Sequence, residues 1–420
     1  MQRMLLSPLS LRERNLNMKK EGRISIWEAM DLVCRDLPVM AEREVFLTEG
    51  LGQVLSRDVY TLISQPPFPR SAMDGYALKA EETLGASGAS PKLFKLAGCQ
   101  YAGDPYFREL KAGEALRIMT GAAIPEGADA VVRQEDTEEK DGQVAVLREV
   151  KAWQNYCPVG EDFSSGECLA KAGDRVDAFL ISAAAAAGVE NFRVRSSPRV
   201  SILTTGDEIQ EPGTELKEGK IYNSHTALFM ARLRQMGCRP AIVASVGDED
   251  RFIRDKISEA AGCSDLIITT GGVSVGLKDC LPRVMEELNA RIVFHGISVK
   301  PGMPTMFSLY KDVPVLSLSG NPYSASAIFE LLVQPMIKKM TLSSQDVLKK
   351  VVGKSSDSYK KNPGPPRFLR GYYEDGEISF GKDQRNGQTR AGIGSNCLIC
   401  LEEGRGPVET GDPLTAYLLY

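Results

Sequence analysis

Carboxylate side chains stand at the ends of predicted strands in the second half of the chain. Asp207, Glu208, Asp248 and Asp279 each follow a strand candidate, and Lys300 begins a Lys-Pro-Gly turn. Taken alone, each acid could be a helix cap or a solvated turn residue. Two carboxylates about 4 Å apart repel by about 4 kcal/mol at an effective dielectric of about 20, and a hard divalent cation relieves that repulsion. Oxygen ligands beside a phosphate favour Mg²⁺, so Glu208, Asp248 and Asp279 are the candidate magnesium ligands and Lys300 is the candidate counter-charge.

Two glycine-containing turns lie among these acids. The apolar strand 266–270 breaks at 271–276 before a predicted helix, and the strand 313–318 breaks at 319–322 before another. Glycines allow the backbone to turn sharply, and the free N–H groups at a helix start can face an anion. The turns therefore predict a site for a ligand that carries phosphate. Neither a GxGxxG fingerprint nor a GxxxxGK[ST] motif occurs, which argues against nicotinamide and P-loop nucleotide enzymes.

A parallel sheet would bring these residues together. Predicted strands at 200–204, 241–246, 266–270 and 313–318 alternate with predicted helices, which is typical of parallel sheets with right-handed crossovers. Ligands bind such sheets outside the carboxyl ends of the strands. The side chains expected at that edge are Thr204, Glu208, Asp248, Gly271, Gly272, Asp279, Ser319 and Asn321.

The rest of the chain predicts several further domains, because 420 residues exceed a single core. We expect a multidomain α/β and β protein, with a central parallel-sheet α/β domain, a β-rich insert, a helical and extended N-terminal domain and a small C-terminal β-barrel-like domain. Met18 could also be the start of the chain. The expected bounds are 1–23 for a disordered leader, 24–64 plus 163–195 for the N-terminal domain, 65–162 for the insert, 196–345 for the α/β domain and 346–420 for the C-terminal domain.

The composition excludes several classes of function. The net charge of −4 offers no basic field for nucleic acid, and no apolar run reaches the roughly 20 residues that a membrane span needs. Nine scattered cysteines predict free thiols in a reducing, cytoplasmic compartment. Cys397 and Cys400 have metal-like spacing, but residues three apart in a strand point to opposite faces, so we expect no zinc site. His225 and His295 are too few for a histidine-rich metal centre, and we interpret His295 as structural.

Two further acids stand in rigid turns of the first half. Asp74 follows three prolines within 65–77 and precedes Gly75, a pattern that predicts a tight turn. Asp74 is either a turn residue or a carboxylate held on a rigid loop. Asp162 lies in a second turn, at 160–166.

Taken together, these motifs resemble the molybdopterin molybdenumtransferase family. This is the MoeA family, which includes the E domains of gephyrin and of plant Cnx proteins. The resemblance covers nearly the whole chain from about residue 24, in the order of the family. The segments that carry it are 66–77 (PPFPRSAMDGYA), 117–132, 204–208 (TTGDE), 271–276 (GGVSVG), 300–302 (KPG) and 319–322 (SGNP).

The resemblance implies an enzyme that inserts molybdenum from molybdate into the dithiolene of adenylylated molybdopterin, with Mg²⁺-dependent loss of AMP. It implies an elongated four-domain homodimer, whose cleft joins the α/β domain of one subunit to domains of the other. A molybdopterin adenylyltransferase is the implied supplier of substrate. The implied catalytic residues are Asp74, Asp162, Glu208, Asp248, Asp279 and Lys300, with Glu208, Asp248 and Asp279 also as metal ligands. The implied substrate-binding residues are Thr120, Gly271, Gly272, Val273, Ser274, Gly276, Pro301, Ser319, Gly320, Asn321, Pro322, Arg370 and Ser395.

Two positions depart from the family pattern. Some members carry lysine where this chain has Gly296 and Met303, so positive charge near Lys300 is reduced. The departures leave two alternatives: a pterin-binding scaffold without turnover, or an insertase that prefers tungstate. A third alternative is an adenylyltransferase of the MogA type, which shares the glycine turn but lacks the 66–77 segment and the C-terminal β module.

Overall fold

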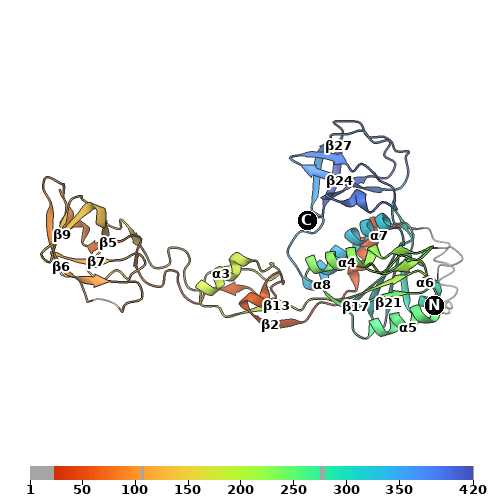
Figure 1. Ribbon diagram of the computed structural model, residues 1–420, viewed down its shortest axis with the longest axis horizontal. Coiled ribbons are helices and arrows are strands. Elements are labelled where there is room, and N and C mark those ends of the chain that lie inside the picture. The colour runs from red at the N-terminus through yellow and green to blue at the C-terminus, as the bar shows by residue number, and fades with distance from the viewer. Residues whose placement is uncertain (1–22, 106–107, 275–279, 420) are drawn as a thin grey trace, which may run out of the picture.

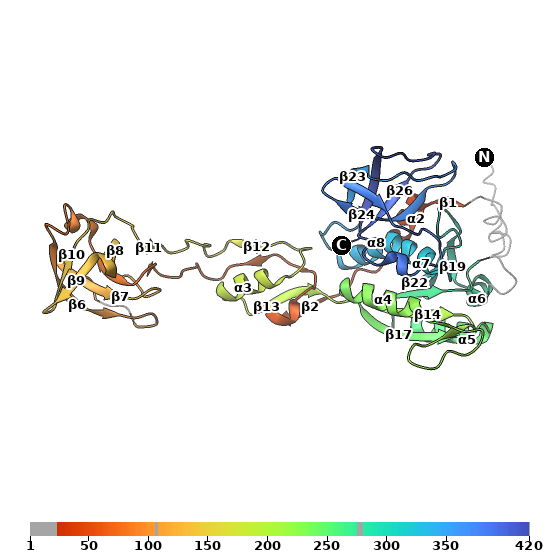
Figure 2. The ribbon, with the colours of Figure 1, turned by 45° about the horizontal axis from the view of Figure 1, so that its top comes forward.

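The computed structural model describes residues 23–105, 108–274 and 280–419, and it is elongated (Figure 1). A β-rich part lies at one end, a narrow part lies in the middle, and the α/β sheet with the C-terminal barrel beside it forms the other end. Figure 2 shows the same separation from a second direction. Residues 1–22, Gly276 and Asp279 lie outside the described residues. In the described part, no helix is long and apolar enough to cross a membrane.

Six strands form the sheet of the α/β part. The first four strands in the order below run parallel to one another, as predicted. The order is β17 (Arg239–Val246), β14 (Arg199–Thr205), β18 (Leu266–Thr270), β22 (Val313–Leu318), β21 (Met306–Tyr310) and β19 (Arg291–His295). The helices that follow or cover these strands are α2 (Ile26–Arg35), α4 (Ser224–Gln235), α5 (Asp250–Ala261), α6 (Leu281–Glu287), α7 (Pro322–Ile328) and α8 (Gln334–Thr341).

The two faces of this sheet bury separate clusters. Ile202 packs in the cluster that also holds apolar residues of α2, α4, α7 and α8, whereas its neighbour Leu203 packs with residues of α5 and α6. Successive strand residues point to opposite faces, so a continuous apolar strand is buried on both sides. The sheet is therefore enclosed on both faces, and its carboxyl edge is left for a ligand.

One edge of the sheet differs from the predicted parallel arrangement, because β21 and β19 run antiparallel to their neighbours. The cause is the two-residue turn between β21 and β22, where Lys311 and Asp312 have φ of 50° and 63°. A connection this short joins antiparallel strands, and positive φ at both residues suits the twist of a hairpin. The Lys-Asp turn lacks the glycine that usually marks such a hairpin in a sequence.

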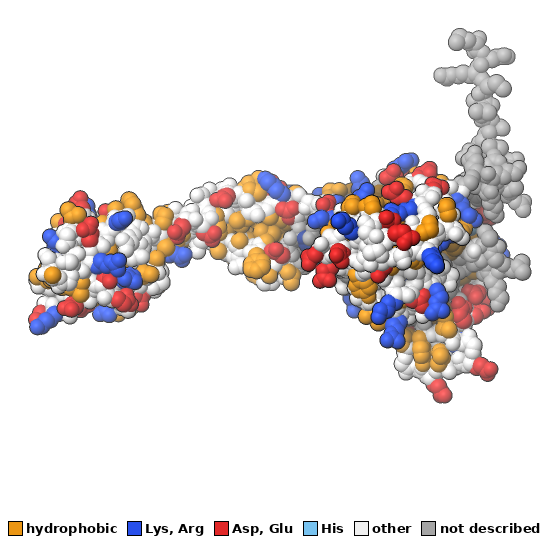
Figure 3. Space-filling model, turned by 90° about the horizontal axis from the view of Figure 1, so that it is seen from above, with side chains coloured by type: hydrophobic (Ala, Val, Ile, Leu, Met, Phe, Trp, Pro, Cys, Tyr) orange, Lys and Arg blue, Asp and Glu red, His pale blue; other side chains and the backbone are white. Residues whose placement is uncertain are grey.

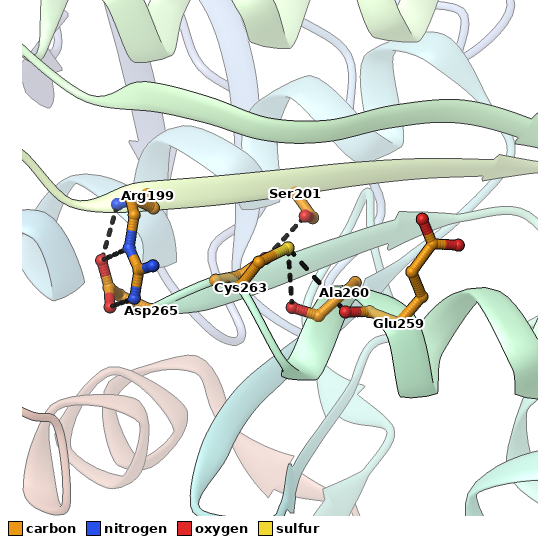
Figure 4. A network of polar contacts seen from close by, with 7 residues as sticks. Arg199, Ser201, Glu259, Ala260, Cys263 and Asp265 are labelled. Carbon is orange, nitrogen blue, oxygen red and sulfur yellow. Dashed lines mark hydrogen bonds and ion pairs between the residues drawn. The ribbon is translucent and has the colours of Figure 1, made fainter.

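An ion pair fixes the opposite, amino edge of the sheet (Figure 4). The Arg199 guanidinium donates to both carboxylate oxygens of Asp265, at 3.2 and 2.9 Å, and the Arg199 N–H donates to the same carboxylate at 2.8 Å. Deeper in the sheet, the buried hydroxyls of Ser201 and Ser264 lie 2.6 Å apart. These contacts hold the starts of β14 and β18 side by side and so set the register of the two strands at the other edge.

The first half of the chain builds the distal and middle parts. The distal sheet has the order β8 (Ala130–Arg133), β5 (Gly75–Leu78), β7 (Glu114–Ile118), β6 (Lys92–Gln100), β10 (Gln143–Val146) and β9 (Thr137–Lys140). The middle part contains β2 (Glu42–Phe46), β3 (Val59–Tyr60), β12 (Cys168–Ala170), α3 (Ala178–Ala186) and β13 (Asn191–Arg195). The pair β4 (Arg70–Ser71) and β11 (Tyr156–Cys157) lies where the distal part begins. The expected domain bounds stay a prediction.

The chain ends in a closed barrel with its own apolar core, in agreement with the predicted barrel-like domain. Its strands are β23 (Lys350–Ser355), β25 (Glu377–Phe380), β24 (Arg367–Glu374), β26 (Cys397–Leu401) and β27 (Pro413–Leu418). Cys397 packs inside the barrel, whereas Cys400 packs in the cluster shared with the α/β sheet. The two thiols thus face opposite sides of β26, as their spacing predicts.

The turn after β18 requires a glycine at its first position. Gly271 has φ of 89°, and a Cβ built there would lie 2.4 Å from the Thr205 backbone oxygen. Its N–H donates to Leu318 O at 3.1 Å, which ties the turn to the end of β22. Backbone and not a flexible side chain occupies the space, so a larger residue would force neighbouring strand ends apart.

We predict that Gly271→Ala destabilises the α/β part by at least about 2 kcal/mol, because positive φ and overpacking act at the same residue. The measurement is the free energy of unfolding in urea. Gly262→Ala is the matched control: Gly262 has φ of −75°, and a Cβ added there would lie 3.4 Å from Glu259 O, an ordinary contact distance. The control should change stability by less than about 1 kcal/mol. Equal effects of the two substitutions would contradict the tight turn.

Candidate active site

The loops after β14 and β17 place acids at the carboxyl edge of the sheet. Asp207 and Asp248 hold each other's backbones: the Asp207 N–H donates to Asp248 Oδ2 at 3.3 Å, and the Asp248 N–H donates to Asp207 Oδ1 at 3.1 Å. The Glu208 carboxylate folds over Gly206, where a Cβ would lie 2.7 Å from Glu208 Oε2. A side chain at position 206 would displace this carboxylate. Glu208 and Asp248 thus lie on neighbouring loops of one edge.

These acids are a partial donor set for a hard cation. Glu208 is exposed and Asp248 is half-buried, and both present carboxylate oxygens. Within residues 23–105, 108–274 and 280–419, no group of three or more acids, histidines or cysteines gathers closely enough to hold a metal ion. The third predicted ligand, Asp279, lies outside that range. The oxygen-only donors present fit Mg²⁺ in kind.

The turn after β18 is braced by side chains on both sides. Thr205 Oγ1 donates to Thr270 O at 3.2 Å, and Leu281 N donates to Gly272 O at 3.0 Å. His295 Nε2 lies 2.9 Å from Val273 O, which assigns the proton to Nε2 and gives His295 the structural role expected of it. Ser274, the last described residue of the turn, is exposed.

Lys300 faces the second predicted turn across a cavity of about 350 Å³. Pro301, Ser319 and Asn321 line the same cavity, so the structure brings together these four predicted residues. Ser319 Oγ accepts the Asn321 N–H at 3.2 Å, which shapes the turn before α7. Gly320 lies against the other turn: a Cβ there would be 3.6 Å from Gly271 Cα. Met303, one of the two departures from the family pattern, also lines this cavity.

Arg370 and Ser395 line a different cavity, of about 330 Å³, together with Pro322. Arg370 is buried; its guanidinium lies 3.7 Å from the centre of the Tyr323 ring and donates to Asp383 O and Gln388 O at 2.9 and 2.6 Å. Burial lowers the pKa of Arg370 from its usual value. Tyr323 lines both cavities and separates this pair from Lys300.

The remaining predicted residues lie at the other end of the molecule. Asp74 precedes β5 and Thr120 follows β7 in the distal part, where Asp74 Oδ1 accepts both the N–H and the hydroxyl of Thr120 at 2.7 Å. These hydrogen bonds hold the pKa of Asp74 below its usual value. Asp162 lies nearer the middle part, and its N–H donates to Gln65 O at 2.9 Å. Within one chain these three residues do not meet the edge of the α/β sheet (Figure 1).

Three polar residues near the site were not singled out from the sequence. Asn223, buried before α4, donates to Glu211, Thr226 and Ser245 at 2.9, 2.9 and 3.0 Å and braces the loop behind Glu208. Lys361 and Arg367 approach Lys300 from the C-terminal part. The basic character of 349–361 was a visible signal for Lys361, but its proximity to Lys300 depends on how the barrel docks.

Three models of known protein families match successive regions of the chain. The MoeA N-terminal region, described as domains I and II, matches residues 24–188. A probable molybdopterin-binding domain matches residues 201–339, and the MoeA C-terminal region, described as domain IV, matches residues 352–419.

Relatives and solved structures extend over nearly the full length. The chain is 32% identical to a molybdopterin molybdenumtransferase of Haemophilus influenzae, over 93% of this chain and 98% of that protein. It is also 32% identical to the molybdopterin molybdenumtransferase of Bacillus subtilis, over 96% and 95%. A crystal structure of a molybdopterin biosynthesis MoeA protein from Pyrococcus horikoshii superposes with a TM-score of 0.81 at 28% identity, covering 94% of this chain and 99% of that one. From its two flanking regions to its central sheet, the chain belongs to the MoeA family.

Proposed function

We propose that this protein is a molybdopterin molybdenumtransferase, which transfers molybdenum from molybdate to adenylylated molybdopterin with Mg²⁺-dependent release of AMP. The observation that carries the proposal is the carboxyl edge of the sheet. There, two glycine-containing turns, the acids Glu208 and Asp248, and the Lys300 cavity adjoin one another. The names of the 30–32% identical relatives support the transferase assignment and molybdenum cofactor biosynthesis as the process.

The turns would bind the pterin substrate through its phosphate. Gly271, Gly272, Val273 and Ser274 form the described part of the first turn, and residues 319–322 form the second. Gly276, which the sequence places in the first turn, lies outside the described residues. Backbone N–H groups in such turns stabilise phosphate oxygens without a side chain. Gly271 and Gly320 lie near each other, because a Cβ on Gly320 would be 3.6 Å from Gly271 Cα, so the two turns adjoin without a side chain between them.

Glu208, Asp248 and Asp279 would hold Mg²⁺, which when bound supplies positive charge to the phosphate that links AMP to the pterin. Asp248 already has its position fixed by Asp207 before any cation arrives. Lys300 would hold molybdate by charge-assisted hydrogen bonds, with Pro301 shaping the cavity wall. Arg370 and Ser395 would form a further anion contact, and the buried Ser395 hydroxyl has no partner among the described residues.

Asp74, Thr120 and Asp162 would complete the site from a second subunit of a homodimer. The middle part supports this arrangement, because every residue of α3 except Ser182 is apolar and most of them are not buried. Phe179 of α3 is 86% exposed and the nearby Leu62 is 64% exposed, and Figure 3 shows hydrophobic side chains gathered over this narrow part. A second copy of the chain would cover that surface. A molybdopterin adenylyltransferase would be the partner that supplies substrate.

The nine cysteines are free thiols, which favours the cytoplasm as the compartment. Met303 in the Lys300 cavity favours two alternatives: a scaffold that binds pterin without turnover, and an insertase that prefers tungstate. The MogA-type adenylyltransferase is less favoured, because the family matches extend to both flanking regions.

The direct test is release of AMP from adenylylated molybdopterin in the presence of Mg²⁺, with molybdate titrated against tungstate. Release that depends on molybdate supports the proposal, whereas a stronger response to tungstate favours the tungstate alternative. Binding of adenylylated molybdopterin without any release of AMP would contradict turnover and favour the scaffold.

We predict that Lys300→Gln raises the molybdate concentration for half-maximal AMP release by roughly 10- to 100-fold, the equivalent of one lost charge-assisted hydrogen bond. The maximal rate should change less, because the acids remain in place. Lys354→Gln, at an exposed lysine of β23 that lies outside the Lys300 cavity, is the control and should behave as the wild type. An unchanged molybdate requirement in Lys300→Gln would remove Lys300 from molybdate binding.

A further inference from the structure

The cavity of about 330 Å³ that Arg370 lines reaches back to the start of α4, and His225 lines that end. The residue before α4 is Asn223, whose side chain accepts the Thr226 N–H at 3.0 Å and so fixes the first turn of the helix. This turn places the imidazole of His225 beside Thr270, the last residue of β18. His225 therefore contacts the residue that directly precedes the first glycine-containing turn.

One nitrogen of this imidazole has a partner and the other has none. Nδ1 lies 3.2 Å from Thr270 Oγ1, whereas the buried Nε2 has no hydrogen-bond partner among the described residues. Stacking holds the ring in this orientation: its centroid lies 5.8 Å from that of Phe229, which stacks in turn on Phe329 at 4.5 Å. His225 is only 7% exposed. A buried polar atom without a hydrogen bond is unfavourable, so a ligand that supplies the bond would be stabilised.

The imidazole carries no charge at neutral pH. Burial lowers the pKa of His225 to about 4. Glu330 lines the same cavity, but it is already paired with Arg232 through hydrogen bonds of 2.7 and 2.8 Å. A neutral imidazole offers a single donor or acceptor at Nε2 and no charge for an ionic partner. The His225 end of the cavity therefore suits an uncharged polar group, in contrast to the Arg370 end.

The other walls of the cavity are largely apolar and come from α4, α7 and the C-terminal part of the chain. The apolar side chains are those of Leu228, Pro322, Ala327, Ile393, Leu398 and Leu419. Small-molecule sites typically occupy roughly 300–1,000 Å³ and combine apolar walls with a few placed polar groups. A flat heterocyclic ring suits such a space, because its faces bury apolar area while a nitrogen at its edge pairs with Nε2.

The two glycine-containing turns adjoin this cavity. His225 contacts Thr270, which precedes Gly271, and Pro322, the last residue of the second turn, lines the cavity wall. A ligand whose phosphate lies in the turns can therefore place a neighbouring ring against His225.

We propose that the His225 end of this cavity binds an uncharged nitrogen heterocycle, with His225 Nε2 as a hydrogen-bonding contact to the edge of the ring. The inference rests on the proposed function for the source of the ring. Adenylylated molybdopterin contains two such heterocycles, the adenine of its AMP group and the pterin. Both rings carry nitrogen acceptors and an amino group at their edges, so either one can pair with Nε2.

The test is equilibrium dialysis of the full chain with three probes: AMP, ribose 5-phosphate, which lacks the base, and free pterin. If adenine is the occupant, AMP should bind at least about tenfold more tightly than ribose 5-phosphate. His225→Phe keeps a flat ring against Phe229 but removes both nitrogens, so it should raise the Kd of AMP by about five- to tenfold and leave that of ribose 5-phosphate unchanged. His225→Gln retains a hydrogen-bonding group and should recover part of the affinity.

If the pterin ring is the occupant, free pterin should show this dependence on His225 and AMP should not. Ile393→Ala removes part of an apolar wall at a residue that is 76% exposed, so folding should be preserved. It should raise the Kd of the same ligand by about threefold. Leu93→Ala, at a leucine of β6 that is 64% exposed and lies outside the cavity, is the matched control and should bind as the wild type does.

Absence of binding by both AMP and free pterin, or wild-type affinity for both in His225→Phe and Ile393→Ala, would overturn the proposal. Binding of these probes requires neither molybdate nor turnover. Its failure is therefore distinguishable from a failure to release AMP from adenylylated molybdopterin, which would contradict the proposed reaction.

Discussion

The docking of the C-terminal barrel against the α/β sheet determines the chemistry at Lys300. Two backbone hydrogen bonds of Lys300, to Pro366 and from Phe368, continue the barrel into the loop that carries the lysine. The Tyr323 hydroxyl donates to Phe368 O at 2.9 Å and fixes the start of α7 to the same strand. Both hydrogen bonds of Lys300 join backbone atoms, so they do not depend on which side chains are present. They bring side chains of the α/β part and of the barrel to the same cavity.

A buried ion pair supports the same junction from behind. Arg232 of α4 binds Glu330 through two hydrogen bonds, at 2.7 and 2.8 Å, and it also donates to Leu419 O near the end of the chain at 3.0 Å. Both side chains are only 9% exposed, so removal of one partner would leave a buried charge uncompensated. Through Arg232, the pair links the end of the chain at Leu419 to the helices beneath the site. The position of Lys300 therefore depends on contacts well beyond its own loop.

The sequence predicted the strands of the α/β part well, since each apolar run stops at a glycine or a polar turn. It predicted Glu208 and Asp248 at one edge for the same reason, and the structure brings their loops together. It missed the antiparallel edge because the Lys311-Asp312 turn has no glycine to mark it. Lys361 and Arg367 were also missed, since a cavity assembled from separate segments has no local spacing. Local chemistry left Asp74 as either a turn residue or a carboxylate held on a rigid loop, and its hydrogen bonds to Thr120, 46 residues away, needed a structure to be seen.

From the elongated shape we propose that the two ends of one chain contribute to different copies of the site in a homodimer. The most direct test of this proposal is to co-express Asp74→Asn and Asp248→Asn chains with different affinity tags and purify the molecules that carry both. Each variant alone should release no AMP. A mixed dimer with the site shared between subunits has one intact site of two, so it should show about half of the wild-type activity. Mixed molecules as inactive as their parents would contradict a site built from two subunits.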